Sequence, residues 1–173
     1  MKEDLAGIQL RLRALEPEDL DFLYSIENDE SLWDFGCANV PYSKYSLNNY
    51  ILNGTCDIFA DKQMRLLMEN GERMPVGLID LFNFEPKHLR AEVGIVVAKN
   101  YRHSGYGHRA LQQIVAYARH TLHLHQLYVI VDNENTYSKK LFEGVGFTVG
   151  ATLKDWVLKD DHYVDAVMMH FFL

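Results

Sequence analysis

Cysteine is scarce in this sequence: only Cys37 and Cys56 occur in 173 residues, and they do not form a Cys-x-x-Cys pair. Their number and spacing exclude a disulfide framework and a zinc knuckle, and they favour a reducing, cytoplasmic compartment. Basic residues are also few, since 17 Lys and Arg stand against 24 Asp and Glu, for a formal net charge of −7. The basic footprint of a nucleic-acid-binding protein is therefore missing. An acidic surface instead attracts cations such as amines.

Long apolar runs are missing as well. The first 13 residues lack the apolar core of a signal peptide, and no segment reaches the roughly 18 consecutive apolar residues that cross a bilayer. The four prolines are scattered, and there is no repeat, linker or low-complexity tract. We therefore expect one domain over residues 1–173 that does not associate with a membrane.

Hydrophobic periodicity predicts both strands and helices. Strands are expected at 8–13, 64–68, 75–84, 90–97, 127–131, 147–157 and 163–171. Helices are expected at 17–27, 43–51, 105–120 and 135–143. The Asn70-Gly71 pair marks a hairpin, so that 63–98 forms a three-stranded antiparallel meander. The predicted order is β-α-α-β-β-β-α-β-α-β-β.

A glycine-rich turn between the strand 90–97 and the helix 105–120 is the most informative segment. Its glycines, Gly105 and Gly107, let a backbone approach a ligand closely. The first amides of the helix lack internal partners, so the turn suits a pyrophosphate. The three-glycine dinucleotide fingerprint and the lysine of a P-loop are absent. On the motif alone, a simple glycine-containing helix cap explains the turn equally well.

Two motifs in register identify a family. The segment 102–107, RHSGYG, resembles the Arg/Gln-x-x-Gly-x-Gly/Ala signature of the GNAT N-acetyltransferases. The segment 135–147 resembles that family's second element, which runs from an Asn-x-x-Ser to a Gly-Phe. Residues 10–20, 76–81 and 90–93 are similar to the branch that holds the spermidine and ribosomal-protein N-terminal acetyltransferases.

The resemblance implies an α/β fold with a mixed, strongly twisted sheet of about seven strands and flanking helices. It implies acetyl-CoA as cosubstrate, held where the fourth and fifth strands splay apart. The acceptor would be a primary amine, either a small polyamine-like molecule or a peptide N-terminus. The alternative is a CoA-binding sensor that has lost catalysis, and the oligomeric state stays open. The residues expected to bind the cofactor are Ile95, Val96, Val97, Arg102, His103, Ser104, Gly105, Tyr106, Gly107, His108, Asn135, Ser138 and Lys140.

Glu92 is the candidate catalytic base. A lysine-like amine has a pKa of about 10.4, so a base must remove its proton before it attacks a thioester. Glu92 lies on the strand face opposite Ala91 and Val93, next to the expected thioester. The alternative is a structural carboxylate that caps a loop amide. A backbone N–H near Val96 would stabilise the oxyanion.

The sequence departs from the family pattern in two places. The loop 37–44 lacks the acidic pair of the spermidine enzymes and carries Lys44. The acids Glu27, Asp29, Glu30 and Asp34 remain nearby, and we interpret them as a solvated helix end rather than an amine site. Phe142 replaces the tyrosine that protonates the leaving thiolate in many family members, which leaves water, Tyr128 or Tyr163 for that role.

Two further groups are expected to be structural. His120, His123 and His125 lie at a helix end and lack an obvious fourth ligand, so we predict no metal site. The aromatic residues could line a substrate mouth, but we favour core packing for them; they are Trp33, Phe35, Tyr42 and Tyr45.

Overall fold

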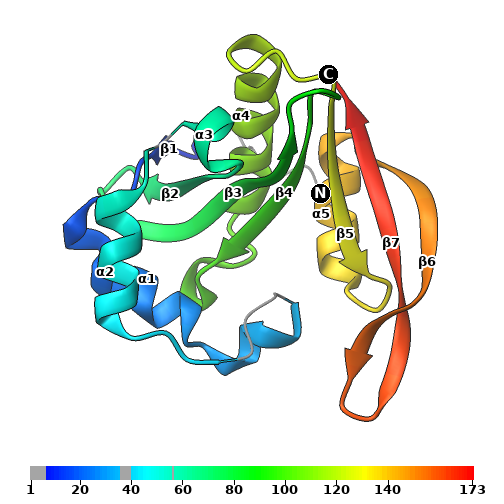
Figure 1. Cartoon of the computed structure of the whole chain (residues 1–173), viewed down its shortest axis with the longest axis horizontal. Coiled ribbons are helices and arrows are strands. Elements are labelled where there is room, and N and C mark those ends of the chain that lie inside the picture. The colour runs from blue at the N-terminus through cyan, green and yellow to red at the C-terminus, as the bar shows by residue number, and fades with distance from the viewer. Residues whose placement is uncertain (1–6, 36–39, 56) are drawn as a thin grey trace.

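The structure, a computed structural model, describes residues 7–35, 40–55 and 57–173. Its seven strands form a single twisted sheet in the order β1-β2-β3-β4-β5-β7-β6 (Figure 1). The strands are β1 (Leu10–Arg13), β2 (Met64–Asn70), β3 (Pro75–Glu85), β4 (Arg90–Val97), β5 (Gln126–Asp132), β6 (Thr148–Lys159) and β7 (His162–Phe172). The predicted α/β architecture and its mixed sheet are confirmed.

The helices follow the predicted order with one addition. They are α1 (Leu20–Glu27), α2 (Lys44–Asn53), α3 (Ile58–Asp61), α4 (Tyr106–His120) and α5 (Thr136–Val145), and the 3-10 turns are η2 (Pro17–Asp19), η3 (Glu30–Phe35) and η4 (Lys99–Tyr101). The sequence did not predict α3, because a helix of one turn is too short to show periodicity. The side chain of Asp57 caps α3 by accepting the Phe59 amide at 2.9 Å.

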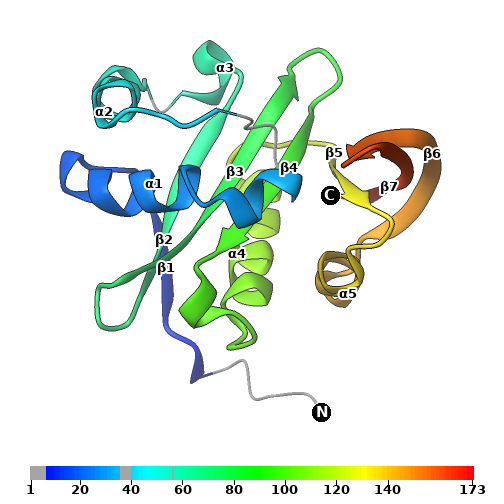
Figure 2. The same ribbon diagram turned by 90° about the horizontal axis from the view of Figure 1, so that it is seen from below.

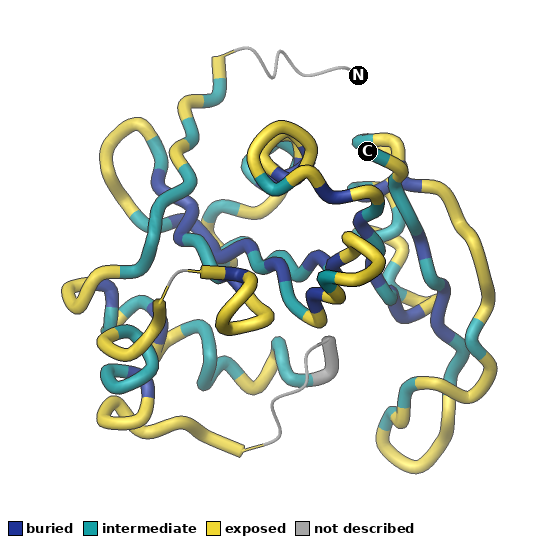
Figure 3. The backbone as a smooth tube through the Cα atoms, turned by 45° about the horizontal axis from the view of Figure 1, so that its top comes forward, coloured by how far each residue is buried: buried dark blue, intermediate teal, exposed yellow. Residues whose placement is uncertain are grey.

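Helices cover both faces of the sheet (Figure 2). On one face, Leu23 of α1 and Leu47 of α2 pack on Leu67 and Leu78. On the other, α4 buries its apolar stripe, which includes Leu111 and the residues at helical spacing from it. Burial is concentrated along the central strands, while the outer part of the β6–β7 hairpin is exposed (Figure 3). No helix among the described residues combines the length and the apolar character needed to cross a membrane.

The sheet opens between β4 and β5. These parallel strands pair only over Arg90–Gln126, Ala91–Leu127 and Glu92–Tyr128. β4 remains paired with β3 as far as Val97, and β5 remains paired with β7 as far as Asp132. The two strands meet near the C-terminus and then diverge (Figure 1). Within the described chain no strand pairs with the β5-facing edge of β4 beyond Glu92, and this opening is called the splay below.

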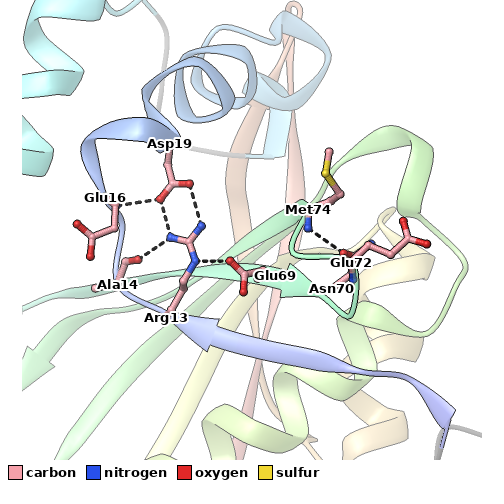
Figure 4. Close-up of polar contacts among 8 residues, drawn as sticks. All are labelled: Arg13, Ala14, Glu16, Asp19, Glu69, Asn70, Glu72 and Met74. Carbon is pink, nitrogen blue, oxygen red and sulfur yellow. Dashed lines mark hydrogen bonds and ion pairs between the residues drawn. The ribbon is translucent and has the colours of Figure 1, made fainter.

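An ion-pair cluster anchors the N-terminal segment (Figure 4). The Arg13 guanidinium donates from Nη1 and Nη2 to the two carboxylate oxygens of Asp19, at 2.7 and 3.0 Å, and from Nε to Glu69 at 2.6 Å. Asp19 also accepts the Glu16 amide at 2.8 Å. Burial alone would raise the pKa of Asp19, but Arg13 and the Glu16 amide outweigh it and hold the pKa below its usual value. The segment that resembles one family branch therefore joins β1, η2 and β2.

The predicted Asn70-Gly71 turn is present at the β2–β3 hairpin. The Asn70 side-chain oxygen accepts the amides of Glu72 and Met74, at 3.0 and 2.9 Å (Figure 4). This side chain satisfies backbone donors that the turn leaves without strand partners. The predicted meander of β2, β3 and β4 is confirmed.

Candidate active site

The open edge of β4 forms one wall of the splay. Ile95 and Val97 pack toward α4, whereas Val96 packs toward α1 and α2. This alternation matches the faces predicted from the sequence. The unpaired amides and carbonyls of this edge can hydrogen-bond an extended ligand as a neighbouring strand would.

The glycine-rich turn closes the end of this wall. Gly105 has a left-handed φ of 79° and stands at the N-cap of the 15-residue helix α4. No side chain from the described part of the chain caps this helix, so its first amides are open to an anion. Arg102 donates from Nε to the Val97 carbonyl at 3.0 Å, which ties the turn to the end of β4.

Two residues of the turn border a cavity next to the β2–β3 turn. Ser104 and Tyr106 border a cavity of about 590 Å³ whose other wall includes Gln9 and Gly71.

Gly107 serves helix packing. It is buried, and a Cβ atom there would lie 3.2 Å from Cδ2 of Leu141 and 3.6 Å from Cγ2 of Val97. The absence of a side chain thus lets α4 approach both α5 and β4. His108 lies one position further along, with its ring 3.6 Å from the Cβ position of Gly144, so it packs against α5.

The second wall of the splay carries β5 and α5. Asn135 caps α5 by accepting the Ser138 amide through its side-chain oxygen at 3.0 Å. The structure thus brings together two of the predicted cofactor contacts, and their pairing explains why this motif starts a helix. Lys140 is exposed on the same helix.

Glu92 lies where the two walls meet. It is the last residue of β4 that pairs with β5, directly opposite Tyr128. Asn83 donates from Nδ2 to Oε2 of Glu92 at 2.9 Å. Burial first, and then the charge and hydrogen bond of Glu92, raise the pKa of Tyr128, while Arg90 and Asn83 act in the opposite direction.

The sequence analysis did not identify Asn83 as a site residue. Asn83 interrupts the β3–β4 register between Phe82 and Glu85 and has a left-handed φ of 48°. Asparagine tolerates this conformation better than most residues. The available signal was an asparagine within the apolar strand 81–84, which by itself does not reveal a bulge.

The structure separates the candidate proton donors. Phe142 is buried at 2% exposure with its ring edge-on to Phe147, centroids 5.1 Å apart. Tyr163 is 60% exposed on the β6–β7 hairpin. Tyr128 is half-buried beside Glu92. Of the two tyrosines that the sequence offered, Tyr128 is the one at the splay.

The acids near the end of α1 have partners within the chain. Glu27 accepts from Nη1 of Arg65 at 2.5 Å, and Arg65 also donates to both oxygens of Asp80 at 2.9 Å. Asp29 accepts the amide and hydroxyl of Ser31, at 3.0 and 2.6 Å. Both acids are thus bound within the chain, but Glu27 is held in a mostly buried ion pair and is not solvated as predicted. The sequence did not predict Arg65, whose partners come from two distant elements.

Lys44 is paired with Asp21, at 2.6 Å between Nζ and Oδ1. The acids Glu30 and Asp34 belong to η3, and Glu30 is exposed. The loop that differs from the family pattern also contains Cys37 to Asn39. These residues lie outside the described residues, as does Cys56.

The aromatic residues differ from the prediction. Tyr45 is 77% exposed and Tyr42 is 38% exposed, so core packing was wrong for Tyr45, which α2 turns toward solvent. Trp33 is half-buried and donates its indole N–H to the Glu27 carbonyl at 3.1 Å. The side chain of Phe35 lies outside the described part.

The histidine group is dispersed by the turn after α4. The ring of His125 packs against that of Phe172 at a tilt of 54°, with centroids 5.7 Å apart, and His123 has a left-handed φ of 51°. Among the described residues, no three His, Cys, Asp or Glu side chains gather in a way that could hold a metal ion.

This fold and this site belong to a known family. The acetyltransferase (GNAT) domain family matches residues 9–148, and the chain belongs to it. It is an acetyltransferase that uses acetyl-CoA, as the two sequence motifs predicted.

Spermidine N-acetyltransferases are among its relatives. Spermidine N(1)-acetyltransferase of Escherichia coli (strain K12) is 28% identical over 164 residues, covering 94% of this chain and 86% of the relative. The crystal structure of spermidine N-acetyltransferase from Vibrio cholerae in complex with CoA and spermine has a TM-score of 0.82 at 26% identity and covers 95% of each chain. A dodecameric structure of spermidine N-acetyltransferase from Vibrio cholerae has a TM-score of 0.79 at 28% identity, covering 95% of this chain and 94% of that one.

Proposed function

We propose that the chain transfers the acetyl group of acetyl-CoA to a primary amine of a polyamine, with the reaction at the root of the splay. The observation that carries this proposal is the position of Glu92, a half-buried carboxylate at the point where the open edge of β4 begins. We also propose that residues 1–173 act as one domain in the cytoplasm. Support for this comes from the single sheet that β1 to β7 form and from the low cysteine content.

The residues of the first wall fit an elongated, anionic cofactor. In this proposal the edge of Ile95, Val96 and Val97 binds the pantetheine arm by backbone hydrogen bonds. The amides from Arg102 to His108 bind the pyrophosphate, favoured by the left-handed Gly105 and by the dipole of α4. Asn135 and Ser138 hold the start of α5, and Lys140 adds a positive charge near the nucleotide.

Glu92 is proposed to accept the proton of the amine. Acetyl-CoA supplies a thioester carbonyl, and the amine must be neutral to attack it. A carboxylate on the strand face opposite the buried Ala91 and Val93 can take that proton directly or through water. The N–H groups on either side of Val96, those of Ile95 and Val97, lie on the open edge, because Ala98 donates toward β3 and successive residues of a strand alternate. They can stabilise developing negative charge.

A polyamine fits this chain better than a peptide N-terminus. The named activities of relatives that match 94% of the chain support it, as does the net charge of −7. Lys44, in the loop where those enzymes carry an acidic pair, does not present an unpaired charge to a cation, because Asp21 neutralises it.

An acetylation panel tests the proposal. Free CoA thiol would be measured with acetyl-CoA and spermidine, spermine, putrescine, a monoamine and peptides with free N-termini. We expect turnover with the polyamines, lost in Glu92→Gln and retained in the matched control Glu72→Gln on the exposed β2–β3 turn. Turnover with peptides alone would contradict the proposal that the acceptor is a polyamine. Binding of acetyl-CoA without transfer to any amine would favour the sensor.

We further infer that the chain self-associates through the β6–β7 hairpin. β6 is an edge strand that is exposed along most of its length, and Trp156, Leu158 and Tyr163 are 55%, 58% and 60% exposed. An edge that combines free backbone groups with large apolar side chains is suited to pair with another chain. The dodecameric Vibrio cholerae relative supports this inference.

A further inference from the structure

We infer that Asn83 and Tyr128 are positioning residues for Glu92: two neutral side chains, one from each neighbouring strand, that orient its carboxylate at the root of the splay. The inference rests on the proposed role of Glu92 as the base. Neither residue belongs to the motifs by which the family is recognised.

Asn83 reaches Glu92 because of a local distortion in β3. The register between β3 and β4 shifts between Phe82 and Glu85, and Asn83 adopts its left-handed φ of 48° at that shift. In a regular strand Asn83 would point to the face opposite Phe82, since side chains alternate. The bulge turns its amide toward the partner of Phe82, and Nδ2 donates to Oε2 of Glu92 at 2.9 Å.

Tyr128 approaches the same carboxylate from the other side. It is the β5 residue paired with Glu92, and this pair is the last before the strands separate. Burial and the Glu92 charge raise the pKa of Tyr128, which favours its neutral hydroxyl, and a neutral hydroxyl can donate to the paired carboxylate. A tyrosine held neutral in this way is suited to orienting a carboxylate.

Other titratable residues on β4 and the neighbouring strands include Arg90, Asp80 and His170. Arg90, on the same strand, acts on Tyr128 through its charge. Asp80 lies opposite Gly94, on the same sheet face as Glu92, and is bound by Arg65. His170 lies opposite Tyr128 on β7, and its Nε2 is 3.3 Å from the hydroxyl of Thr148.

The physical consequence concerns the protonation of the base. Hydrogen bonds from neutral donors favour the charged form of a carboxylate. A base that must accept a proton acts in its charged form, so the loss of a donor is expected to show in the pH dependence of activity. Removing either one should move the acid limb of the activity profile to higher pH.

The test measures kcat/KM for spermidine against pH in four variants. Tyr128→Phe and Asn83→Gly each remove one donor, and glycine accommodates the left-handed φ of position 83. Asn83→Asp places a second negative charge beside Glu92. Tyr117→Phe is the matched control, because it removes the same hydroxyl group from a tyrosine that lies on α4. The pH titration of the Glu92 side-chain carboxyl, followed by ¹³C NMR, gives a readout that does not depend on the acceptor.

We expect the acid limb and the NMR titration to move up by ~0.5–1 pH unit in Tyr128→Phe and Asn83→Gly, further in Asn83→Asp, and not at all in the control. An unmoved acid limb in folded Tyr128→Phe and Asn83→Gly would overturn the inference. A shift of the alkaline limb alone in Tyr128→Phe would make Tyr128 the proton donor instead. Full activity of Glu92→Gln would show that Glu92 is not the base. That result would contradict the proposed function and is distinct from a failure of the roles inferred for Asn83 and Tyr128.

Discussion

The rings of His103 and Tyr137 meet edge to face across the mouth of the splay, with centroids 5.5 Å apart and planes at 64°. His103 belongs to the glycine-rich turn before α4, and Tyr137 lies in the first turn of α5. This contact joins the turn before α4 to the first turn of α5. His103 has a left-handed φ of 62°, which is uncommon outside glycine.

Tyr137→Ala should weaken acetyl-CoA binding severalfold, because the turn loses the contact that pre-organises it. Tyr137 is 74% exposed, so the free energy of unfolding should change by only about 0.5 kcal/mol. Isothermal titration calorimetry and urea unfolding would measure the two quantities. Tyr45→Ala is the matched control, since Tyr45 is 77% exposed on α2. Tighter binding in Tyr137→Ala would mean that the contact competes with the cofactor.

Gly105→Asp and Gly105→Asn should separate charge from backbone strain. Both residues tolerate the left-handed region better than other side chains, so both variants should lose similar stability. The aspartate adds a negative charge at the amides proposed to bind pyrophosphate. We expect acetyl-CoA to raise the melting temperature of Gly105→Asn and not of Gly105→Asp. Equal stabilisation of the two variants would argue against a pyrophosphate at α4.

Glu92→Gln should lower kcat/KM by about 10²-fold or more near neutral pH. The deficit should shrink at alkaline pH, where the amine loses its proton without help. A series of kcat/KM measurements from pH 6 to 10 would show this convergence. A deficit that stays constant across the series would assign Glu92 to a structural role.

Asp19→Asn should destabilise the N-terminal anchor. The pKa of Asp19 is held below its unfolded value of about 3.9, so its contribution is present above that value and is lost as the pH falls through the folded pKa. At pH 7 the variant should lose up to about 3 kcal/mol, because a partly buried ion pair is broken. The difference in the free energy of unfolding between the variant and the wild type should become smaller toward pH 3. Urea unfolding from pH 3 to 7 would test this, with the exposed Asp161→Asn as control; a gap independent of pH would contradict it.

Trp156→Glu should reduce the size of the assembly. A charged side chain in the exposed apolar surface of the β6–β7 hairpin disfavours pairing with a second copy. Analytical ultracentrifugation would give the mass of each species. Phe59→Glu, an equally large change at an exposed residue of α3, should leave the mass unchanged. A wild-type protein that is monomeric at all concentrations would contradict the self-association.

The positions of the strands and main helices could be predicted from the local pattern of apolar and polar residues. The apolar stripe of α4 and the alternation of β4 each reflect which face is buried, and that periodicity is a property of consecutive residues. The glycine-rich turn and the Asn135 cap could also be located, because a left-handed residue and a helix start require particular side chains. Glu92 could be selected as a carboxylate on an otherwise apolar strand.

Tertiary structure alone decided what surrounds Glu92. Asn83 and Tyr128 reach it through a bulge and through a parallel pairing between strands more than 30 residues apart in sequence, and neither leaves a periodic signal. Likewise, Arg65 binds acids from α1 and β3, and Gly107 is glycine because Leu141 packs against it. Local sequence thus determined where the elements and the key residues lie, whereas long-range packing determined which side chains meet, because contacts between distant segments depend on the register and twist of the whole sheet.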